Sequence, residues 1–400
     1  MNNENLNGMK RLTIVVFGGT GDLMKRKLVP ALASLLYKKI ISSDSTIIGI
    51  ARGDLNDESY KNVLIESAKN SVNKEQIKQL NIKFFRGDAN NPESLAKLSD
   101  FIKSIEPKEG RNRILYLSTS FNLFPAIIQQ LKAQSLHEQK NSNFVRVVFE
   151  KPFGFNLESS NILEKSIHNV FSEDQIFRID HYLAKETVQN ISILKFTNPL
   201  FNYLLRKDAV ESISLTVDED IGVGNRIAYY NETGAIKDMI QSHLLQVLSL
   251  ILMENPSELK AEKIHDEKVR ALQNLKVLPS EHHFLGQYQS YTREASLLGI
   301  TESKTETFAR MILECVNERW KGVKLILRTG KMLKRKFGQI MVNFRSLPDK
   351  INNPLPNIVN NQMIIDIYPT QDIKLILNTR KPLTQGDIEK ISLDFCHESY

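Results

Sequence analysis

The stretch Leu12–Leu23, LTIVVFGGTGDL, joins an apolar run to a glycine-rich turn and decides the first half of the fold. Leu12–Phe17 is almost continuously apolar, as expected of a strand that is buried on both faces. Gly19 and Gly21 allow a tight turn and a close approach of the backbone to a ligand, and a helical pattern begins at Leu23. A strand, a glycine-rich turn and a helix in this order bind the pyrophosphate of a dinucleotide at the helix N-terminus. The predicted coenzyme contacts of this turn are Gly18, Gly19, Thr20, Gly21, Asp22 and Leu23.

The same alternation continues to about residue 150. Further strand-like runs occur at Thr46–Ile50, Ile82–Phe85, Ile114–Leu117 and Val145–Phe149. Helical patterns lie between the runs, at about Leu23–Tyr37, Glu58–Ser71, Pro92–Ser104 and Leu123–Leu136. Strands and helices in alternation predict an α/β domain with a doubly wound, Rossmann-type parallel sheet.

The pattern changes after Asp180. A long helix with an apolar stripe is expected at about Glu232–Met253, and a charged helix at Pro256–Asn274. Strands without intervening helices follow at Phe308–Val316, Val323–Arg328, Ile340–Phe344, Met363–Tyr368 and Ile373–Asn378. Strands in succession predict an α+β domain with a large antiparallel sheet. Because 400 residues are too many for one core, we expect two domains, residues 1–180 and 181–400.

Composition narrows the class of partner. The net charge of +7 suggests anionic ligands, and Lys331–Lys336 is the only dense basic cluster, which favours phosphate ligands over nucleic acid. No apolar run is long enough to span a bilayer and residues 1–10 do not resemble a signal peptide, so we expect a cytoplasmic protein without a membrane partner. Cys315 and Cys396 lack metal-ligand spacing and are expected to be reduced thiols, with no metal site.

The residue at the end of the second predicted strand bears on the choice of dinucleotide. A carboxylate there would bind the ribose 2′-hydroxyl of NAD, but the chain has Ala51, Arg52 and Gly53. A guanidinium suits a 2′-phosphate, so the sequence favours NADP, with NAD as a weaker alternative. The other interpretation of Arg52 is a solvated loop cation.

A second group of polar residues lies in Phe177–Glu186, where five of ten residues are acidic or basic. His181 and Lys185 are four apart and would share a helix face if the helix begins near His181. Asp180 would then orient a distant base while the other two bind an anion, although a capped helix start with solvated charges is the alternative.

Two further residues allow two interpretations each. Lys151, in Glu150–Gly154, follows the fifth predicted strand at the edge where α/β sheets bind ligands, yet ordinary turn chemistry explains it equally well. His243 lies on the apolar stripe of the long helix, where a histidine is more often a core residue than a base.

Taken together, these segments resemble the glucose-6-phosphate dehydrogenase family. Motifs that follow the family's order and approximate spacing occur at Phe17–Pro30, Glu150–Gly154, Arg178–Asn190, Tyr229–His243, Ser303–Phe308 and Arg328–Leu333. The resemblance implies oxidation of glucose 6-phosphate to its 6-phosphogluconolactone with hydride transfer to NADP, the first step of the oxidative pentose phosphate pathway. It also implies a homodimer or homotetramer.

The resemblance assigns roles to individual residues. His243 is similar to the family's general base, and Asp180 to the carboxylate that orients it. The residues similar to the family's substrate contacts are His181, Tyr182, Lys185, Lys151, Glu219, Asp238, Lys331 and Lys336. Lys27 and Lys151 resemble lysines between substrate and coenzyme, while Thr20 and Arg52 match coenzyme contacts.

The chain also departs from the family pattern. Ala184 replaces a glycine, Phe121 lies where a proline-containing pair is usual, and Met332 replaces an arginine. Asp366 stands where some members use arginine for a second, structural NADP, so we expect that site to be absent. The chain ends about where the family begins a further helical segment.

These departures motivate an alternative function: a non-catalytic relative that binds sugar phosphate or nucleotide, or an inactive truncated form. A dehydrogenase of another sugar or polyol is a third hypothesis, which the predicted phosphate contacts disfavour.

Overall fold

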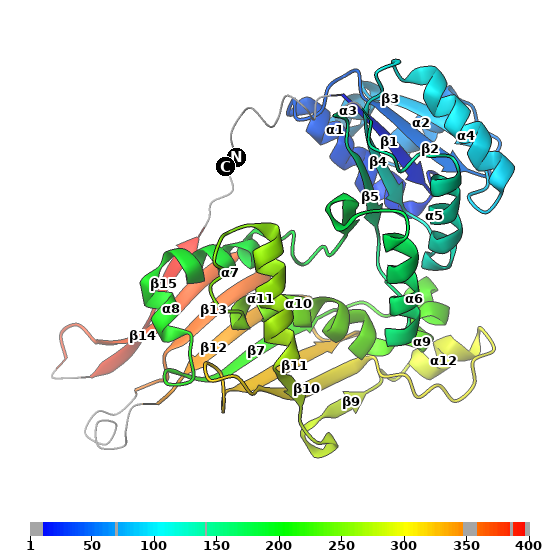
Figure 1. The fold of residues 1–400 in the computed structure, drawn as a ribbon. Helices are drawn as coiled ribbons and strands as arrows, with labels where there is room; N and C mark the ends of the chain where they lie inside the picture. Colours follow the sequence, from blue (N-terminus) through cyan, green and yellow to red (C-terminus); the bar gives the residue numbers. More distant parts are fainter. Residues whose placement is uncertain (1–10, 69–70, 141, 347–357, 385–386, 397–400) are drawn as a thin grey trace. The chain divides into compact units, whose positions relative to one another are not determined.

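The computed structural model describes residues 11–68, 71–140, 142–346, 358–384 and 387–396. The chain forms two compact units, divided between Ile179 and Asp180 (Figure 1). Within the described ranges, no helix is long and apolar enough to cross a membrane.

The described part of the first unit holds a six-stranded parallel sheet in the order β3-β2-β1-β4-β5-β6. Its strands are β1 (Leu12–Phe17), β2 (Thr46–Ala51), β3 (Asn81–Arg86), β4 (Asn112–Leu117), β5 (Val145–Phe149) and β6 (Ile176–Arg178). The five predicted strands are confirmed. β6 is an addition, and its last two residues, Phe177 and Arg178, fall in the polar segment from which we expected a helix start.

Helices cover both faces of this sheet, so alternate residues of β1 pack into two separate cores. Val15 and Phe17 pack with α4 (Pro92–Ile105), α5 (Phe124–Ala133) and α6 (Leu157–His168). Ile14 and Val16 pack on the other side with the π-helical turn η2 (Met24–Leu28) and with α1 (Val29–Tyr37), α2 (Asp57–Glu66) and α3 (Ser71–Lys78). The doubly wound architecture is confirmed.

The helix predicted over Glu58–Ser71 is shorter than expected. Asn56 caps the start of α2 by accepting a hydrogen bond from Ser59 N at 2.8 Å. The helix ends at Glu66, where the Ser67 hydroxyl donates to the Val63 carbonyl at 2.7 Å. Such side-chain competition for a helical carbonyl favours a helix end. The next helix, α3, begins at Ser71, the residue at which we expected the first helix to end.

The described part of the second unit holds a nine-stranded sheet, ordered β15-β14-β13-β12-β7-β11-β10-β8, with β9 paired to β10. Its strands are β7 (Val210–Asp218), β8 (Leu275–Val277), β9 (Phe284–Gly286), β10 (Phe308–Cys315), β11 (Lys324–Gly330), β12 (Phe337–Phe344), β13 (Gln362–Tyr368), β14 (Asp372–Arg380) and β15 (Ile388–Cys396). The five predicted strands are confirmed. The predicted large antiparallel sheet is also confirmed, and one of its ladders, β7 with β11, is parallel.

Helices pack on this sheet around the largest apolar core of the unit (Figure 1). They are α7 (Glu186–Thr197), α8 (Pro199–Leu204), α10 (Leu245–Leu252) and α11 (Ala261–Gln273), together with the π-helix η6 (Ile236–Leu244). α11 begins five residues after the predicted start at Pro256. α9 (Ile227–Ala235) and α12 (Tyr291–Ser296) contribute to a smaller apolar cluster of tyrosine and aliphatic side chains.

The long helix predicted over Glu232–Met253 is interrupted at Gly234. Gly234 has φ 63° and ψ −179°, a conformation that is essentially restricted to glycine. A Cβ at this position would lie 2.3 Å from Oε1 of Glu306, and the same oxygen accepts a hydrogen bond from Ile236 N at 3.0 Å. Glu306 therefore caps the start of the π-helix in the space that the missing side chain leaves.

Candidate active site

The segment Asp180–Lys185 is a hydrogen-bonded turn. Asp180 Oδ1 accepts from Tyr182 N at 2.9 Å, and the Asp180 carbonyl accepts from Leu183 N at 3.2 Å. The helix α7 begins only at Glu186, with Lys185 as its N-cap. The expectation that His181 and Lys185 share a helix face is therefore wrong, because the aspartate side chain stabilises a turn at this position.

The turn places Asp180 against His243. Nδ1 of His243 lies 2.7 Å from Oδ1 of Asp180, and the His243 residue is 1% exposed. Burial opposes ionisation of Asp180, but the hydrogen bond from His243 and the imidazole charge outweigh it and lower the pKa of this carboxyl. An acceptor at Nδ1 favours the tautomer with its proton on Nδ1, so the lone pair of neutral His243 is on Nε2.

The rings of His181, Tyr182 and His243 form one cluster. The His181 and Tyr182 rings lie 4.5 and 4.7 Å from the His243 ring, and 4.7 Å from each other. Tyr182 is 5% exposed, whereas His181 is exposed. The cluster fixes the imidazole plane of His243 while His181 retains access to solvent.

Two lysines lie over the ring of Tyr368. The Nζ atoms of Lys185 and Lys336 are 5.2 and 5.6 Å from its centroid, and its hydroxyl lies 3.4 Å from the Tyr182 hydroxyl. Burial and the charge of Lys336 lower the pKa of Lys185. The two ammonium groups therefore repel each other, and an anion such as phosphate would relieve this repulsion. We did not predict Tyr368; its place at the end of β13, before Pro369, was the available signal.

Two carboxylates of the predicted site already have basic partners. Glu219 forms an ion pair with Lys331, whose ammonium also lies 5.4 Å from the Tyr230 ring. Asp238 Oδ1 lies 3.7 Å from Arg226 Nη2, and Asp238 is 3% exposed. Asp238 and His243 are five positions apart on η6, and the i→i+5 bonds of a π-helix bring such residues nearly onto one face. The π-helix thus directs both side chains to the same side.

In the first unit, the glycine-rich turn has the geometry of a phosphate cradle. Gly18 has φ 87°, and a Cβ on it would lie 2.1 Å from the Ser118 carbonyl oxygen. The N–H groups of Gly18 and Gly19 both donate to Ile50 O, at 3.1 and 2.8 Å. The N–H of Gly21 donates to Gly18 O at 2.9 Å, and the helix begins at Asp22. Backbone donors to a pyrophosphate would therefore come from Thr20 and from the first turn of the helix, with the glycines shaping the turn.

Other predicted coenzyme contacts lie at the carboxyl edge of this sheet or beside it. Arg52 is exposed, just after β2, and forms no ion pair or hydrogen bond with any described residue. The nearby carboxylate of Asp54 is paired with Arg86 at 2.9 Å. Lys27 is exposed on η2, and Asp22 pairs with Arg26 at 2.6 Å. Lys151 is half-buried after β5 and precedes Pro152 with a cis peptide bond.

The four departures from the family pattern have different surroundings. The Ala184 side chain is exposed in the turn before α7. Met332 is 52% exposed with φ 54°, and the Phe121 ring packs edge-on against Phe155 at 4.5 Å. Asp366 accepts from Gln339 at 2.8 Å and pairs with Lys374 at 3.1 Å.

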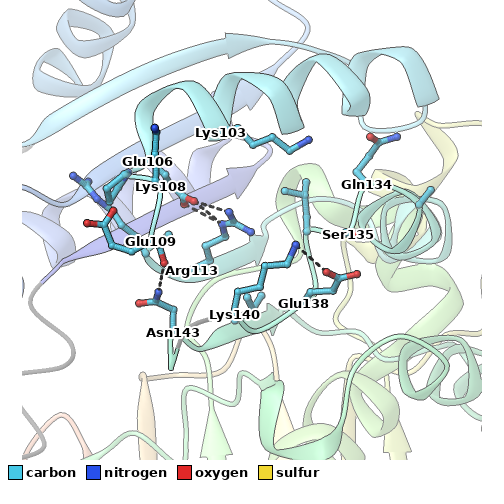
Figure 2. Close-up of a pocket in the computed structure, with 16 residues that line it drawn as sticks. Lys103, Glu106, Lys108, Glu109, Arg113, Gln134, Ser135, Glu138, Lys140 and Asn143 are labelled. Atoms are coloured by element: carbon cyan, nitrogen blue, oxygen red, sulfur yellow. Dashed lines mark hydrogen bonds and ion pairs between the residues drawn. The ribbon is translucent and has the colours of Figure 1, made fainter.

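A cavity of about 580 Å³ lies at the opposite, amino edge of the parallel sheet (Figure 2). The loops before β4 and β5 line it, and Arg113 and Lys140 on its wall are paired with Glu106 and Glu138. No residue predicted for the active site or the coenzyme site lines this cavity. Its position also differs from the carboxyl edge at which open α/β sheets bind ligands.

Comparison with known families gives two matches that together cover almost the whole chain. Residues 15–190 match the family model "Glucose-6-phosphate dehydrogenase, NAD binding domain", and residues 192–400 match "Glucose-6-phosphate dehydrogenase, C-terminal domain".

Individual proteins give the same result. The chain is 36% identical to glucose-6-phosphate 1-dehydrogenase of Borreliella burgdorferi, over 96% of the chain and 82% of that protein. It is 34% identical to the Bacillus subtilis enzyme, over 98% and 83%. Among solved structures, glucose-6-phosphate dehydrogenase in complex with glucose 6-phosphate superposes with a TM-score of 0.88 at 30% identity, covering 97% of this chain and 82% of that one.

Proposed function

Because the chain belongs to the glucose-6-phosphate dehydrogenase family, we propose that it oxidises glucose 6-phosphate to the 6-phosphogluconolactone with NADP as the hydride acceptor. The observation that carries the proposal is the pair formed by Asp180 and the buried His243, whose Oδ1 and Nδ1 atoms lie 2.7 Å apart. A buried imidazole oriented by a carboxylate is the arrangement that general-base catalysis requires. It also argues against the alternative of a non-catalytic relative.

The proton of the C1 hydroxyl would pass to Nε2 of His243. Nδ1 already faces Asp180, so Nε2 is the basic atom, and the carboxylate stabilises the imidazolium that forms. A nicotinamide coenzyme, when bound, accepts the hydride that leaves C1. Removal of both the proton and the hydride converts the hemiacetal carbon into the lactone carbonyl.

The remaining predicted residues would bind the sugar phosphate. His181, Tyr182, Lys185 and Lys336 would bind the phosphate, supported by the two lysines that already share the Tyr368 ring. Glu219 and Asp238 would accept hydrogen bonds from sugar hydroxyls, with Lys331 beside Glu219. Lys27 and Lys151 would lie between substrate and coenzyme.

A spectrophotometric assay of the purified protein tests the proposed reaction. Glucose 6-phosphate with NADP should produce reduced coenzyme, whereas glucose without the phosphate should react far more slowly. Absence of turnover with glucose 6-phosphate and either coenzyme would refute the proposed function.

We propose that the protein prefers NADP because Arg52, which follows β2 at the carboxyl edge of the sheet, forms no ion pair with a described residue. The nearby carboxylate of Asp54 is paired with Arg86 instead. Arg52→Ala should lower kcat/KM for NADP by about 1.5–3 kcal/mol, roughly ten- to a hundredfold, and leave NAD nearly unchanged. Arg11→Ala removes an exposed arginine at the other edge of the sheet and is the matched control. An unchanged ratio of NADP to NAD in Arg52→Ala would make Arg52 a solvated loop residue.

We further propose that residues 181–400 provide the contacts of a homodimer or homotetramer, and that the protein acts in the cytoplasm. Family membership supports the first part, and the absence of paired cysteine spacing supports a reducing compartment. Sedimentation equilibrium and cell fractionation measure the two properties.

A further inference from the structure

Tyr230 is a buried tyrosine whose hydroxyl does not explain its presence. The residue lies on α9, is 1% exposed, and packs with Val223, Ile227, Tyr291 and Ala295. Among the described residues, no group forms a hydrogen bond with its buried hydroxyl. Because an unpaired buried hydroxyl is unfavourable, hydrogen bonding gives no reason for a tyrosine here. A specific contribution of this residue must therefore come from its ring.

The charged partner of this ring is Lys331. Its Nζ atom lies 5.4 Å from the centroid of the Tyr230 ring, within the range over which an aromatic ring attracts a cation. Lys331 is 8% exposed, so little water screens the attraction, which is stronger at a desolvated site than at the surface. Burial, followed by the charges of Asp238, Glu306 and Glu219, raises the pKa of the Tyr230 hydroxyl, so the ring stays neutral beside the ammonium.

The same ammonium forms the ion pair with Glu219, and the two halves of this pair are held differently. The main chain of Glu219 is fixed on both sides, because its N–H donates to the Gly330 carbonyl at 2.9 Å and its carbonyl accepts from Leu333 N at 3.0 Å. Lys331 reaches the carboxylate through a long, flexible side chain. The Glu219 side chain is 26% exposed against 8% for Lys331, so the carboxylate is the accessible half of the pair.

We infer that Tyr230 is a positioning residue for sugar binding, whose ring holds the Lys331 ammonium against Glu219 so that the carboxylate is oriented before the substrate arrives. This inference rests on the proposed dehydrogenase function, in which Glu219 accepts a hydrogen bond from a sugar hydroxyl. Without the ring, the ammonium loses one of its two described contacts and the lysine side chain regains rotamer freedom. Substrate binding would then have to order the pair, which weakens affinity. The effect should appear in KM, because Lys331 and Glu219 are assigned to binding and not to proton transfer.

The test compares Tyr230→Leu, which removes the ring, with Tyr230→Phe, which removes only the hydroxyl. In Tyr230→Leu, KM for glucose 6-phosphate should rise roughly five- to thirtyfold with little change in kcat, as expected from the loss of a desolvated cation–π contact. Tyr230→Phe should restore the wild-type KM. Tyr291→Leu is the matched control and should leave KM unchanged, because Tyr291 is 0% exposed in the same cluster and no described cation lies over its ring. If Tyr230→Leu does not fold, Tyr230→Met, with a flexible apolar side chain, takes its place.

A double-mutant cycle measures the contact without substrate. Urea denaturation, followed by the fluorescence of the single tryptophan, Trp320, gives the loss of stability caused by Tyr230→Leu. This loss should be smaller in the Lys331→Met background than in the wild type, whereas the loss caused by Tyr291→Leu should be the same in both. Additive losses for Tyr230→Leu and Lys331→Met would overturn the inference.

The kinetic outcomes distinguish the ring from the hydroxyl and from general packing. An unchanged KM in folded Tyr230→Leu would overturn the inference, as would an equal rise of KM in Tyr230→Phe or in Tyr291→Leu. An inactive wild type would refute the proposed function, and calorimetry with glucose 6-phosphate would then test the inference without turnover. Weaker binding by Tyr230→Leu than by Tyr230→Phe would support the inference, and equal binding would overturn it.

Discussion

Replacing Gly234 with alanine should destabilise the second unit and impair catalysis. The φ and ψ angles of Gly234, 63° and −179°, cost a residue with a side chain about 1–3 kcal/mol. The new Cβ would also lie 2.3 Å from Glu306 Oε1, so Glu306 would have to move and give up its hydrogen bond from Ile236 N. Loss of a hydrogen bond to a charged group adds about 1.5–3 kcal/mol. The free energy of unfolding should therefore fall by about 2.5–6 kcal/mol.

The assay is urea denaturation followed by tryptophan fluorescence. Trp320 is the single tryptophan of the chain and is fully buried in the second unit, so its signal reports on that unit. Gly224→Ala is the matched control, because Gly224 also has a positive φ, 60°, but no atom lies within 4 Å of its added Cβ. It should lose less stability than Gly234→Ala. A loss below about 1 kcal/mol in Gly234→Ala would refute the reasoning about strain and collision.

Two further predictions concern lysines of the second unit. Lys185→Met should raise KM for glucose 6-phosphate roughly ten- to a hundredfold with little change in kcat. Lys334→Met, which replaces an exposed lysine of the basic cluster, should leave KM unchanged. Equal losses of activity on glucose 6-phosphate and on glucose in Lys185→Met would contradict a role of Lys185 in phosphate binding. Burial lowers the pKa of Lys195 from 10.5 to about 7, so between these values the unfolded chain binds a proton that the folded chain does not, and stability should rise with pH across this window. Lys195→Met should remove that rise in Trp320-monitored denaturation, and an unchanged pH dependence would show that other groups cause it.

The apolar strands of the first unit could be predicted because burial on both faces leaves a continuous signal. β1 and β5 have the predicted ends, and the glycine-rich turn lies between strand and helix as expected. The donors to a phosphate could not be predicted in detail. The N–H groups of Gly18 and Gly19 are used by Ile50 O, a contact between segments more than thirty residues apart that no local pattern encodes.

In the second unit, the missing information was also long-range. β7 was not predicted although it lies at the centre of the sheet, and its parallel pairing with β11 depends on how the chain returns after the helices. The break at Gly234 was hidden within an apolar stripe, and it requires Glu306 from a distant segment.

The catalytic pair of Asp180 and His243 could be predicted because the motifs that contain them resemble the family's motifs. The structure places Oδ1 of Asp180 2.7 Å from Nδ1 of His243. Tyr368 was missed because it contributes a ring instead of a charge.

The most direct test of the account is the turnover of His243→Asn. General-base contributions of about 10²–10⁴ predict a fall in kcat of two to four orders of magnitude, with little change in KM for glucose 6-phosphate. His265→Asn, which replaces an exposed histidine of α11, should retain wild-type turnover. If His243→Asn keeps more than a tenth of the wild-type kcat, His243 is not the base and the proposed mechanism is wrong.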